Sequence, residues 1–225
     1  MKTVVKLISI FFILTLLFSF QYDDKYSDFE GIVEYEISFP NQRRPLSKSV
    51  TSKFTIFYKQ GNIRKEYKNI NDSILFYSVY KIDENINYGI TPGNDTITYY
   101  QPTETLFDMT HLEDVKDIEN KVISEIILGY KCNLYRGRLK YNDASDNELP
   151  INYSYYVSEK LKVNPKNLKG EGANFIFMEN GSIILKYIAD KPILRIVTAK
   201  KVIKKKLNDK LFTINQNNKV IQQMQ

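Results

Sequence analysis

Ile126-Ile127-Leu128-Gly129-Tyr130-Lys131-Cys132-Asn133-Leu134-Tyr135-Arg136-Gly137-Arg138-Leu139-Lys140-Tyr141 sets the architecture of this chain. Its apolar residues keep one parity from Ile126 to Leu134 and switch to the other from Tyr135 to Tyr141. A period of two indicates β-structure, and the segment lacks an amphipathic pattern of helix length. Gly129 and Gly137 are places where a strand can bend. The segment therefore predicts a long, bent antiparallel strand or a pair of strands.

Weaker alternating segments lie on both sides of residues 126–141, separated by turn residues. The clearest runs from Phe29 to Phe39, where aromatic and branched residues alternate with Glu and Ser. Such alternation is typical of strands with one face on a core and the other facing water. Further strands are predicted at 50–59, 63–68, 74–81, 86–90, 96–100, 151–157, 174–178, 183–188 and 193–203.

The aromatic residues are 17 Tyr and 13 Phe with no Trp, a bias that favours half-buried strand surfaces. The sequence predicts a mainly β protein, with a single curved antiparallel sheet or unclosed β-barrel and at most a short helix or lid around 103–120. No internal repeat or linker divides the chain, so residues 21–214 are expected to form one β domain. The amide-rich residues 215–225 are expected to be a disordered tail.

The first 20 residues differ in kind from the rest. Lys2 and Lys6 precede an apolar run of 14 residues, Leu7 to Phe20, interrupted only by Ser and Thr. This is the layout of a secretory signal peptide, and the run is short for a membrane span. We expect export to the periplasm, or a secreted or outer-membrane-associated protein, with cleavage near Ser19 to Gln21 and no integral span afterwards. An uncleaved anchor is the alternative, because Leu17 stands where cleavage prefers a small residue.

The net charge of +6 is unevenly distributed. Seven lysines and one acid lie beyond Thr198, whereas residues 21–198 carry 23 basic and 25 acidic residues, a net of −2. Nucleic-acid binding needs a broad basic face, so nucleic acid is not an expected partner. The lysine cluster at 200–210 has two interpretations: contact with anionic lipid, or protection of an edge strand against aggregation, which we favour from sequence.

Residues with obvious catalytic chemistry are scarce. His111 is the sole histidine and Cys132 the sole cysteine, which excludes an internal disulfide and a His-rich metal site and disfavours a Cys–His nucleophile. Cys132 is expected to be a small, buried apolar residue. The acids between Glu104 and Glu119 lack the spacing of a Ca²⁺ loop and predict a solvated acidic face. We therefore expect no enzyme activity, no catalytic residue, no metal and no cofactor. A hydrolase with paired carboxylates is a distant alternative.

Five segments in order and spacing carry a family resemblance. They are Gly31-Ile32-Val33-Glu34-Tyr35, Gly61-Asn62-Ile63-Arg64-Lys65-Glu66, Ile127-Leu128-Gly129-Tyr130-Lys131-Cys132, Tyr156-Val157-Ser158-Glu159-Lys160-Leu161-Lys162-Val163-Asn164-Pro165 and Asn180-Gly181-Ser182-Ile183-Ile184-Leu185-Lys186. Together they resemble the GLPGLI family of secreted proteins from Bacteroidota over nearly the whole mature chain. The family's Gly-Leu-Pro-Gly-Leu-Ile signature is reduced to Gly181-Ser182-Ile183-Ile184, and its usual Trp before the Tyr is Tyr155. The resemblance implies a diverged member with a LolA-like fold, an unclosed antiparallel barrel whose concave face can hold lipid or another apolar partner.

A set of apolar side chains on two predicted strands forms the candidate ligand-binding face. Alternate residues of a strand point to the same side of the sheet, so these side chains share a face. They are Val33, Tyr35, Ile37, Phe39, Phe54, Ile56 and Tyr58. An unclosed barrel leaves part of such a set as a groove.

Two functional hypotheses follow from these patterns. The first is an exported, non-enzymatic protein that binds a lipid, another apolar ligand or an envelope protein on the concave face of a half-barrel. The second is an envelope interaction or structural protein whose cavity is filled by its own Tyr and Phe side chains. A large open cavity favours the first hypothesis, and a filled one favours the second.

Overall fold

The structure is a computed structural model that describes residues 28–43, 45–101, 107–108, 113–114, 122–141, 151–163, 178, 180–191, 193–214 and 219–222. The predicted signal peptide, residues 1–20, lies outside the described residues, as does most of the predicted strand 174–178. Within the described ranges, no helix is both long enough and apolar enough to cross a membrane.

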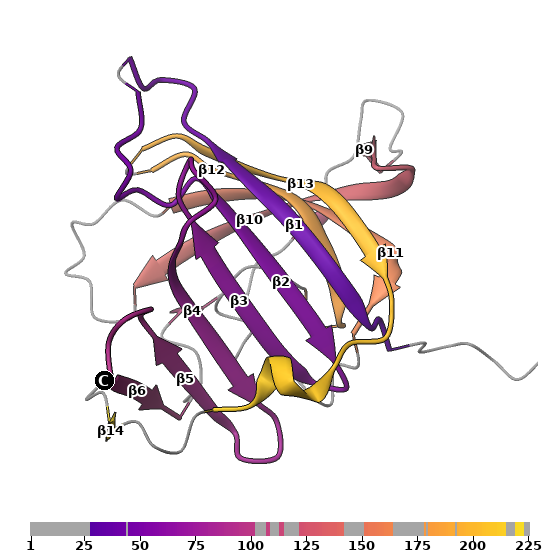
Figure 1. The fold of residues 1–225 in the computed structure, drawn as a ribbon. Coiled ribbons are helices and arrows are strands. Elements are labelled where there is room, and N and C mark those ends of the chain that lie inside the picture. Colours follow the sequence, from indigo (N-terminus) through magenta and orange to yellow (C-terminus); the bar gives the residue numbers. More distant parts are fainter. Residues whose placement is uncertain are drawn as a thin grey trace, which may run out of the picture.

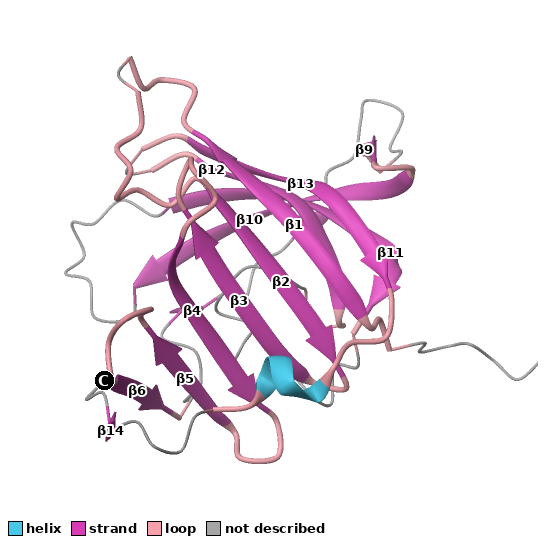
Figure 2. Ribbon diagram, viewed as in Figure 1, coloured by secondary structure: helices cyan, strands magenta, loops and turns pink. Residues whose placement is uncertain are grey.

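The described residues form one strongly curved sheet that is not closed into a barrel (Figures 1 and 2). Its strands are β1 (Gly31–Ser38), β2 (Lys53–Lys59), β3 (Asn62–Lys68), β4 (Ile74–Lys81), β5 (Ile86–Ile90), β6 (Thr96–Tyr100), β7 (Phe107–Asp108), β8 (Glu113–Asp114), β9 (Ser124–Ile127), β10 (Tyr130–Tyr141), β11 (Ile151–Lys162), β12 (Ser182–Ala189), β13 (Arg195–Lys204) and β14 (Lys219–Gln222). The predicted mainly β, unclosed antiparallel sheet is confirmed.

The first strand lies in the middle of this sheet. The strand order is β14-β6-β5-β4-β3-β2-β1-β13-β12-β11-β10-β7, with β8 and β9 also paired to β10. Strands β1–β6 follow one another as a meander, and β13 returns to pair with the free side of β1. In Figure 1 the indigo to magenta strands β1–β6 form one half of the sheet, with yellow β14 beside β6, and strands β10–β13, in pink to yellow-orange, form the other. The pairing of β14 with β6 is parallel, while the other described pairs are antiparallel.

Residues 126–141 adopt the second of the two predicted arrangements, a pair of strands. Strands β9 and β10 form a hairpin, with Ile127 opposite Tyr130. Between them, Leu128 and Gly129 both have positive φ, 51° and 80°. Two consecutive residues in this conformation make the tight turn that suits the twist of a hairpin. Gly129 is therefore a turn residue rather than a kink, and Gly137 lies within β10.

Several boundaries differ from those that the sequence predicts. Strand β11 continues to Lys162, five residues beyond the predicted end at Val157. In the predicted lid, 103–120, the described residues are the short strands β7 and β8, both paired with β10. The predicted disordered tail includes strand β14, whose four residues are all exposed. Strand β13 lies between β1 and β12, so our interpretation of its lysines as edge protection is wrong.

The main core lies on the concave face and joins the two halves of the sheet. Its buried residues come from both halves and include Val33, Tyr35, Phe54, Ile56, Tyr58, Ile63, Tyr80, Cys132, Leu161, Ile183, Leu185, Val197 and Ala199. A second cluster, on the other side of β1–β6, contains Ile32, Val79, Ile90 and Ile97 together with Leu207 and Phe212. Phe212 belongs to the short 3-10 helix η3 (Asp209–Phe212), drawn in cyan in Figure 2. Both faces of this half of the sheet are therefore covered.

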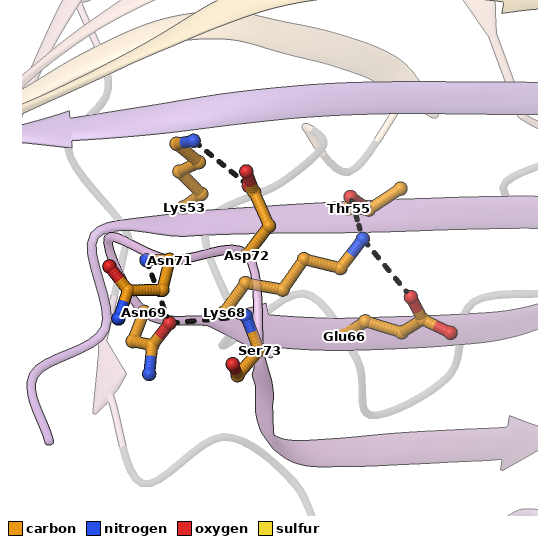
Figure 3. Close-up of polar contacts among 8 residues, drawn as sticks. All are labelled: Lys53, Thr55, Glu66, Lys68, Asn69, Asn71, Asp72 and Ser73. Carbon is orange, nitrogen blue, oxygen red and sulfur yellow. Dashed lines mark hydrogen bonds and ion pairs between the residues drawn. The ribbon is translucent and has the colours of Figure 1, made fainter. Parts of the chain in front are cut away.

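The turn between β3 and β4 is held by the predicted turn residues, as Figure 3 shows. The Asn69 side-chain oxygen accepts hydrogen bonds from the backbone N–H groups of Asn71, at 2.9 Å, and Ser73, at 3.1 Å. Asp72 pairs with Lys53 at 2.9 Å. An Asn that bonds the backbone two residues onward is a usual turn former. The prediction of a turn from Asn69 to Ser73 is confirmed.

The sole cysteine is a core residue, as the sequence predicts. Cys132 is 0% exposed, and its thiol donates to the Tyr130 carbonyl oxygen at 3.4 Å. Burial raises the pKa of the Cys132 thiol to about 11, from an ordinary value of 9.0.

We expect Cys132 to react with Ellman's reagent at pH 8 at least about 100-fold more slowly in the folded protein than in guanidinium chloride. Two units of pKa reduce the reactive thiolate roughly 100-fold, and burial hinders access further. Stopped-flow absorbance measures both rates, and the unfolded chain is its own control. Equal rates in the two states would show that the thiol is exposed.

Candidate binding face of the sheet

Three rows of directly paired residues cross the concave face from β1 toward β6. Residues directly opposite each other in antiparallel strands place their side chains on the same face. The first row is aromatic and consists of Tyr35, Phe54, Tyr67 and Phe76. Successive ring centroids lie 4.7, 6.2 and 5.8 Å apart, so the rings form a continuous band from β1 to β4.

The second row changes character halfway across the sheet. It begins with Val33 and Ile56, which are 0% exposed. It continues through Lys65, Ser78, Gly89 and Thr98 on β3 to β6. Lys65 sits directly opposite Ile56 and is only 3% exposed. The second row is thus apolar over β1 and β2 and becomes polar from β3 onward.

The third row borders the polar part of the second. It runs through Tyr58, Ile63, Tyr80, Asn87 and Tyr100. The Asn87 side-chain nitrogen donates to the Tyr100 hydroxyl at 2.6 Å. Asn87 is 5% exposed, and its side-chain oxygen has no hydrogen-bond partner within the described part of the chain. A buried acceptor without a hydrogen-bond partner lowers the free energy of unfolding by about 1–3 kcal/mol.

These rows enclose a small cavity, which we call the polar hollow, with a volume of about 100 Å³. Its lining residues are Lys65, Tyr67, Phe76, Ser78, Asn87, Gly89, Thr98 and Tyr100. The hollow offers an ammonium group, an amide oxygen and hydroxyl groups beside three aromatic rings. It is therefore suited to a small group that carries both hydrogen-bond acceptors and a donor.

Gly89 limits how much of this space is filled. A Cβ atom at position 89 would lie 2.8 Å from Thr98 Oγ1 and 3.0 Å from Phe76 Cζ. Thr98 Oγ1 already donates to the Gly89 carbonyl oxygen at 3.3 Å. A side chain at position 89 would displace Thr98 or Phe76, so the glycine keeps this wall of the hollow open.

The predicted ligand-binding residues lie on the concave face, but most are part of its core. Val33, Tyr35, Phe54, Ile56 and Tyr58 are 0–7% exposed and belong to one cluster. Ile37 is half-buried against that cluster, and Phe39 is half-buried just beyond the end of β1. The Tyr35 hydroxyl donates to the Ile184 carbonyl oxygen at 2.9 Å, which connects β1 to β12. Ligand binding by these side chains stays a prediction, and it requires some of them to move.

The residues that line the polar hollow were not among those proposed from sequence. One signal was present: Lys65 shares the parity of Ile63 and Tyr67, the apolar side of its strand. A lysine at such a position is either paired or functional. Ser78, Asn87 and Thr98 carry no comparable signal, because only the strand register places them beside Lys65.

No group of three or more His, Cys, Asp or Glu side chains in the described part of the chain can hold a metal ion. Of the acids from Glu104 to Glu119, Asp108, Glu113 and Asp114 lie in β7 and β8, and the others lie outside the described residues.

Comparisons with known proteins find one structural likeness and no matching family or curated protein. No model of a known protein family matches the chain, and no curated protein matches it. A crystal structure of an uncharacterized conserved protein from Thermus thermophilus resembles it, with 8% sequence identity and a TM-score of 0.41. The match covers 86% of this chain and 91% of that chain.

Proposed function

We propose that the protein is an exported, non-enzymatic binding protein of the GLPGLI family with a LolA-like half-barrel. Its ligand is an amphiphile whose small head group enters the polar hollow of the concave face. The observation that carries the proposal is the Asn87 side-chain oxygen, which has no hydrogen-bond partner among the described residues and is buried beside Lys65 in a cavity with room for a head group.

The chemistry of the hollow defines the head group. The Asn87 oxygen accepts a hydrogen bond and therefore calls for an O–H or N–H on the ligand. The Lys65 ammonium attracts an acceptor, best an anionic oxygen. A volume of about 100 Å³ equals roughly three water molecules, which suits a hydroxylated carboxylate but not a whole acyl chain.

The apolar part of the ligand lies along the aromatic row. Tyr67 and Phe76 line the hollow and are both half-buried, so they retain accessible ring surface. Covering apolar surface yields about 25 cal/mol per Å². A short chain resting on these two rings adds to the polar contacts without opening the packed core around Val33 and Ile56.

We expect 3-hydroxydecanoate to displace a fluorescent fatty-acid analogue from the protein about 10-fold more effectively than decanoate, which lacks the donor for Asn87. Asn87→Leu should abolish this difference, since it removes the acceptor. Lys65→Met should weaken both carboxylates about 10-fold or more, because one charge-assisted hydrogen bond is lost. Competition titrations followed by fluorescence anisotropy measure all of these affinities.

Lys53→Met is the matched control for Lys65→Met. Lys53 has a side chain that is 39% exposed and pairs with Asp72, away from the hollow. Lys53→Met removes the same charge as Lys65→Met and should leave the affinities for both carboxylates within about two-fold of the wild-type values. Equal affinities for the two carboxylates, or equal losses in Lys53→Met and Lys65→Met, would contradict binding in the polar hollow.

The burial of Val33, Tyr35, Phe54, Ile56 and Tyr58 favours a second candidate, an envelope interaction or structural protein with a self-filled cavity. In that case a saturating fluorescent probe gives no signal, and native mass spectrometry of protein from its own host finds no bound lipid. The two candidates therefore give opposite results in the same experiment.

A further inference from the structure

Lysines from two distant parts of the chain gather at one end of the sheet, where β1 begins and β11 and β13 end (Figure 1). They surround a cavity of about 320 Å³ that we call the lysine hollow. The lysines are Lys160, Lys162, Lys204, Lys205 and Lys206. Asp28, Phe29 and Glu30 supply the rest of the wall.

Strand pairing explains how these lysines come together. Gly31 pairs with Lys204, which brings the end of β13 to the start of β1. The Phe29 backbone N–H donates to the Lys162 carbonyl oxygen at 2.7 Å, which connects the same residues to the end of β11. The Lys205 backbone N–H donates a hydrogen bond to the Glu30 carbonyl oxygen at 3.3 Å. The lysine hollow is therefore built on hydrogen-bonded backbone, on which Lys162 is half-buried and the other four lysines are exposed.

The positive charge of the lysine hollow exceeds the negative charge around it. Five lysines face two acids, which leaves a net charge of +3 at this wall. The Glu30 carboxylate is held in place, since it accepts the Leu207 backbone N–H at 2.6 Å. None of the five ammonium groups forms an ion pair with another residue in the described ranges. Like charges held close together repel one another unless an anion binds between them.

We propose that the lysine hollow binds phosphate groups. Several ammonium groups around a concave site provide N–H donors and charge for the oxygens of a phosphate, which lysine binds as a point charge. The cavity, about 320 Å³, has room for a phosphate with part of its carrier. Since β13 lies inside the sheet, protection of an edge strand does not account for these lysines. The site is separate from the polar hollow and does not depend on the function proposed there.

The test compares two variants of equal charge. Lys160→Gln/Lys162→Gln/Lys204→Gln removes three charges from the lysine hollow. Lys48→Gln/Lys131→Gln/Lys210→Gln removes three charges from exposed positions outside it. Binding is measured by co-sedimentation with phosphatidylcholine vesicles that contain or lack a quarter of phosphatidylglycerol, and by calorimetric titration with pyrophosphate. Thermal unfolding of both variants establishes that each is folded.

We expect the triple variant of the lysine hollow to bind phosphate-bearing probes about 100-fold more weakly than the wild type. Each lysine that contacts the phosphate contributes roughly tenfold to the affinity, and the variant removes at least two such contacts. The control variant should stay within about three-fold. Loss of vesicle binding identifies a lipid head group as the source of the phosphate, and loss of pyrophosphate binding alone identifies a soluble phosphate compound. Absence of binding to both probes, or equal losses in the two variants, would overturn the proposal.

Discussion

Gly31→Ala should lower the free energy of unfolding by about 3 kcal/mol, the upper range for overpacking a well-packed site. A Cβ atom at this position would lie 2.1 Å from the Ile203 carbonyl oxygen and 3.0 Å from the Phe29 ring. Ile203 belongs to β13, whose pairing with β1 fixes its backbone. Because no flexible side chain can move aside, the strand pair itself must separate.

Gly93→Ala is the control for this substitution. Gly93 has φ of +81°, and no atom lies within 4 Å of the position that a Cβ would take. The alanine is strained there but not obstructed, so we expect a loss of about 1–2 kcal/mol. Guanidinium chloride unfolding followed by circular dichroism gives both values. A Gly31→Ala variant no less stable than Gly93→Ala would mean that β1 and β13 are not so closely apposed.

Stability should fall steeply above pH 10, because several tyrosines are buried with neutral hydroxyls. Burial is the main cause that raises the pKa of Tyr35, Tyr155 and Tyr187 above the ordinary value of 10.0. The folded state then holds these protons more tightly than the unfolded state does. The stabilisation is complete below pH 10 and is lost as pH rises from 10 toward the folded-state pKa values. Each group contributes about 1.4 kcal/mol per pH unit in that window, so the three together approach about 4 kcal/mol per unit.

Denaturant titrations at pH 8, 9, 10, 10.5 and 11 measure this dependence. Tyr35→Phe should reduce the slope above pH 10 by about a third, since it removes one of the three groups. At pH 8 the same variant should lose about 1 kcal/mol, because the Ile184 carbonyl oxygen loses its donor. The comparison with Tyr35→Phe separates tyrosine ionisation from lysine titration in the same range. An unfolding free energy that is the same at pH 9 and pH 11 would disprove the expectation.

Local pattern predicts the strands of this protein well, because one face of nearly every strand meets a core. Phe54, Ile56 and Tyr58 alternate with polar residues, and β2 forms there. The partner of a strand is not encoded locally. The lysines of β13 suggest an edge, yet this strand lies between β1 and β12. The alternation of apolar residues also identifies which side chains lie on the concave face. It does not show whether that face is open or packed, since the burial of Tyr35 and Tyr58 depends on residues from both halves of the sheet.

The candidate sites are harder to predict than the fold, for the same reason. Lys65 carries a signal because it interrupts an apolar face. Asn87 and Thr98 carry no signal in the sequence, because only the strand register places them in the same cavity as Lys65. Lys160 and Lys204 are distant in sequence, and the lysine hollow arises only from the way in which strands β11 and β13 end beside β1.

The central position of β1 determines when this protein can fold. One edge of β1 pairs with β2, its neighbour in sequence. The other edge pairs with β13, which is synthesised more than 150 residues later. The hydrogen bond from Tyr35 to Ile184 spans 149 residues. Contacts between such distant residues must overcome the entropy of closing a long loop, which slows folding. The two halves of the sheet therefore join only after nearly the whole chain has emerged from the ribosome. Late completion of the core would suit the export proposed above, in which the chain passes through a translocation channel unfolded.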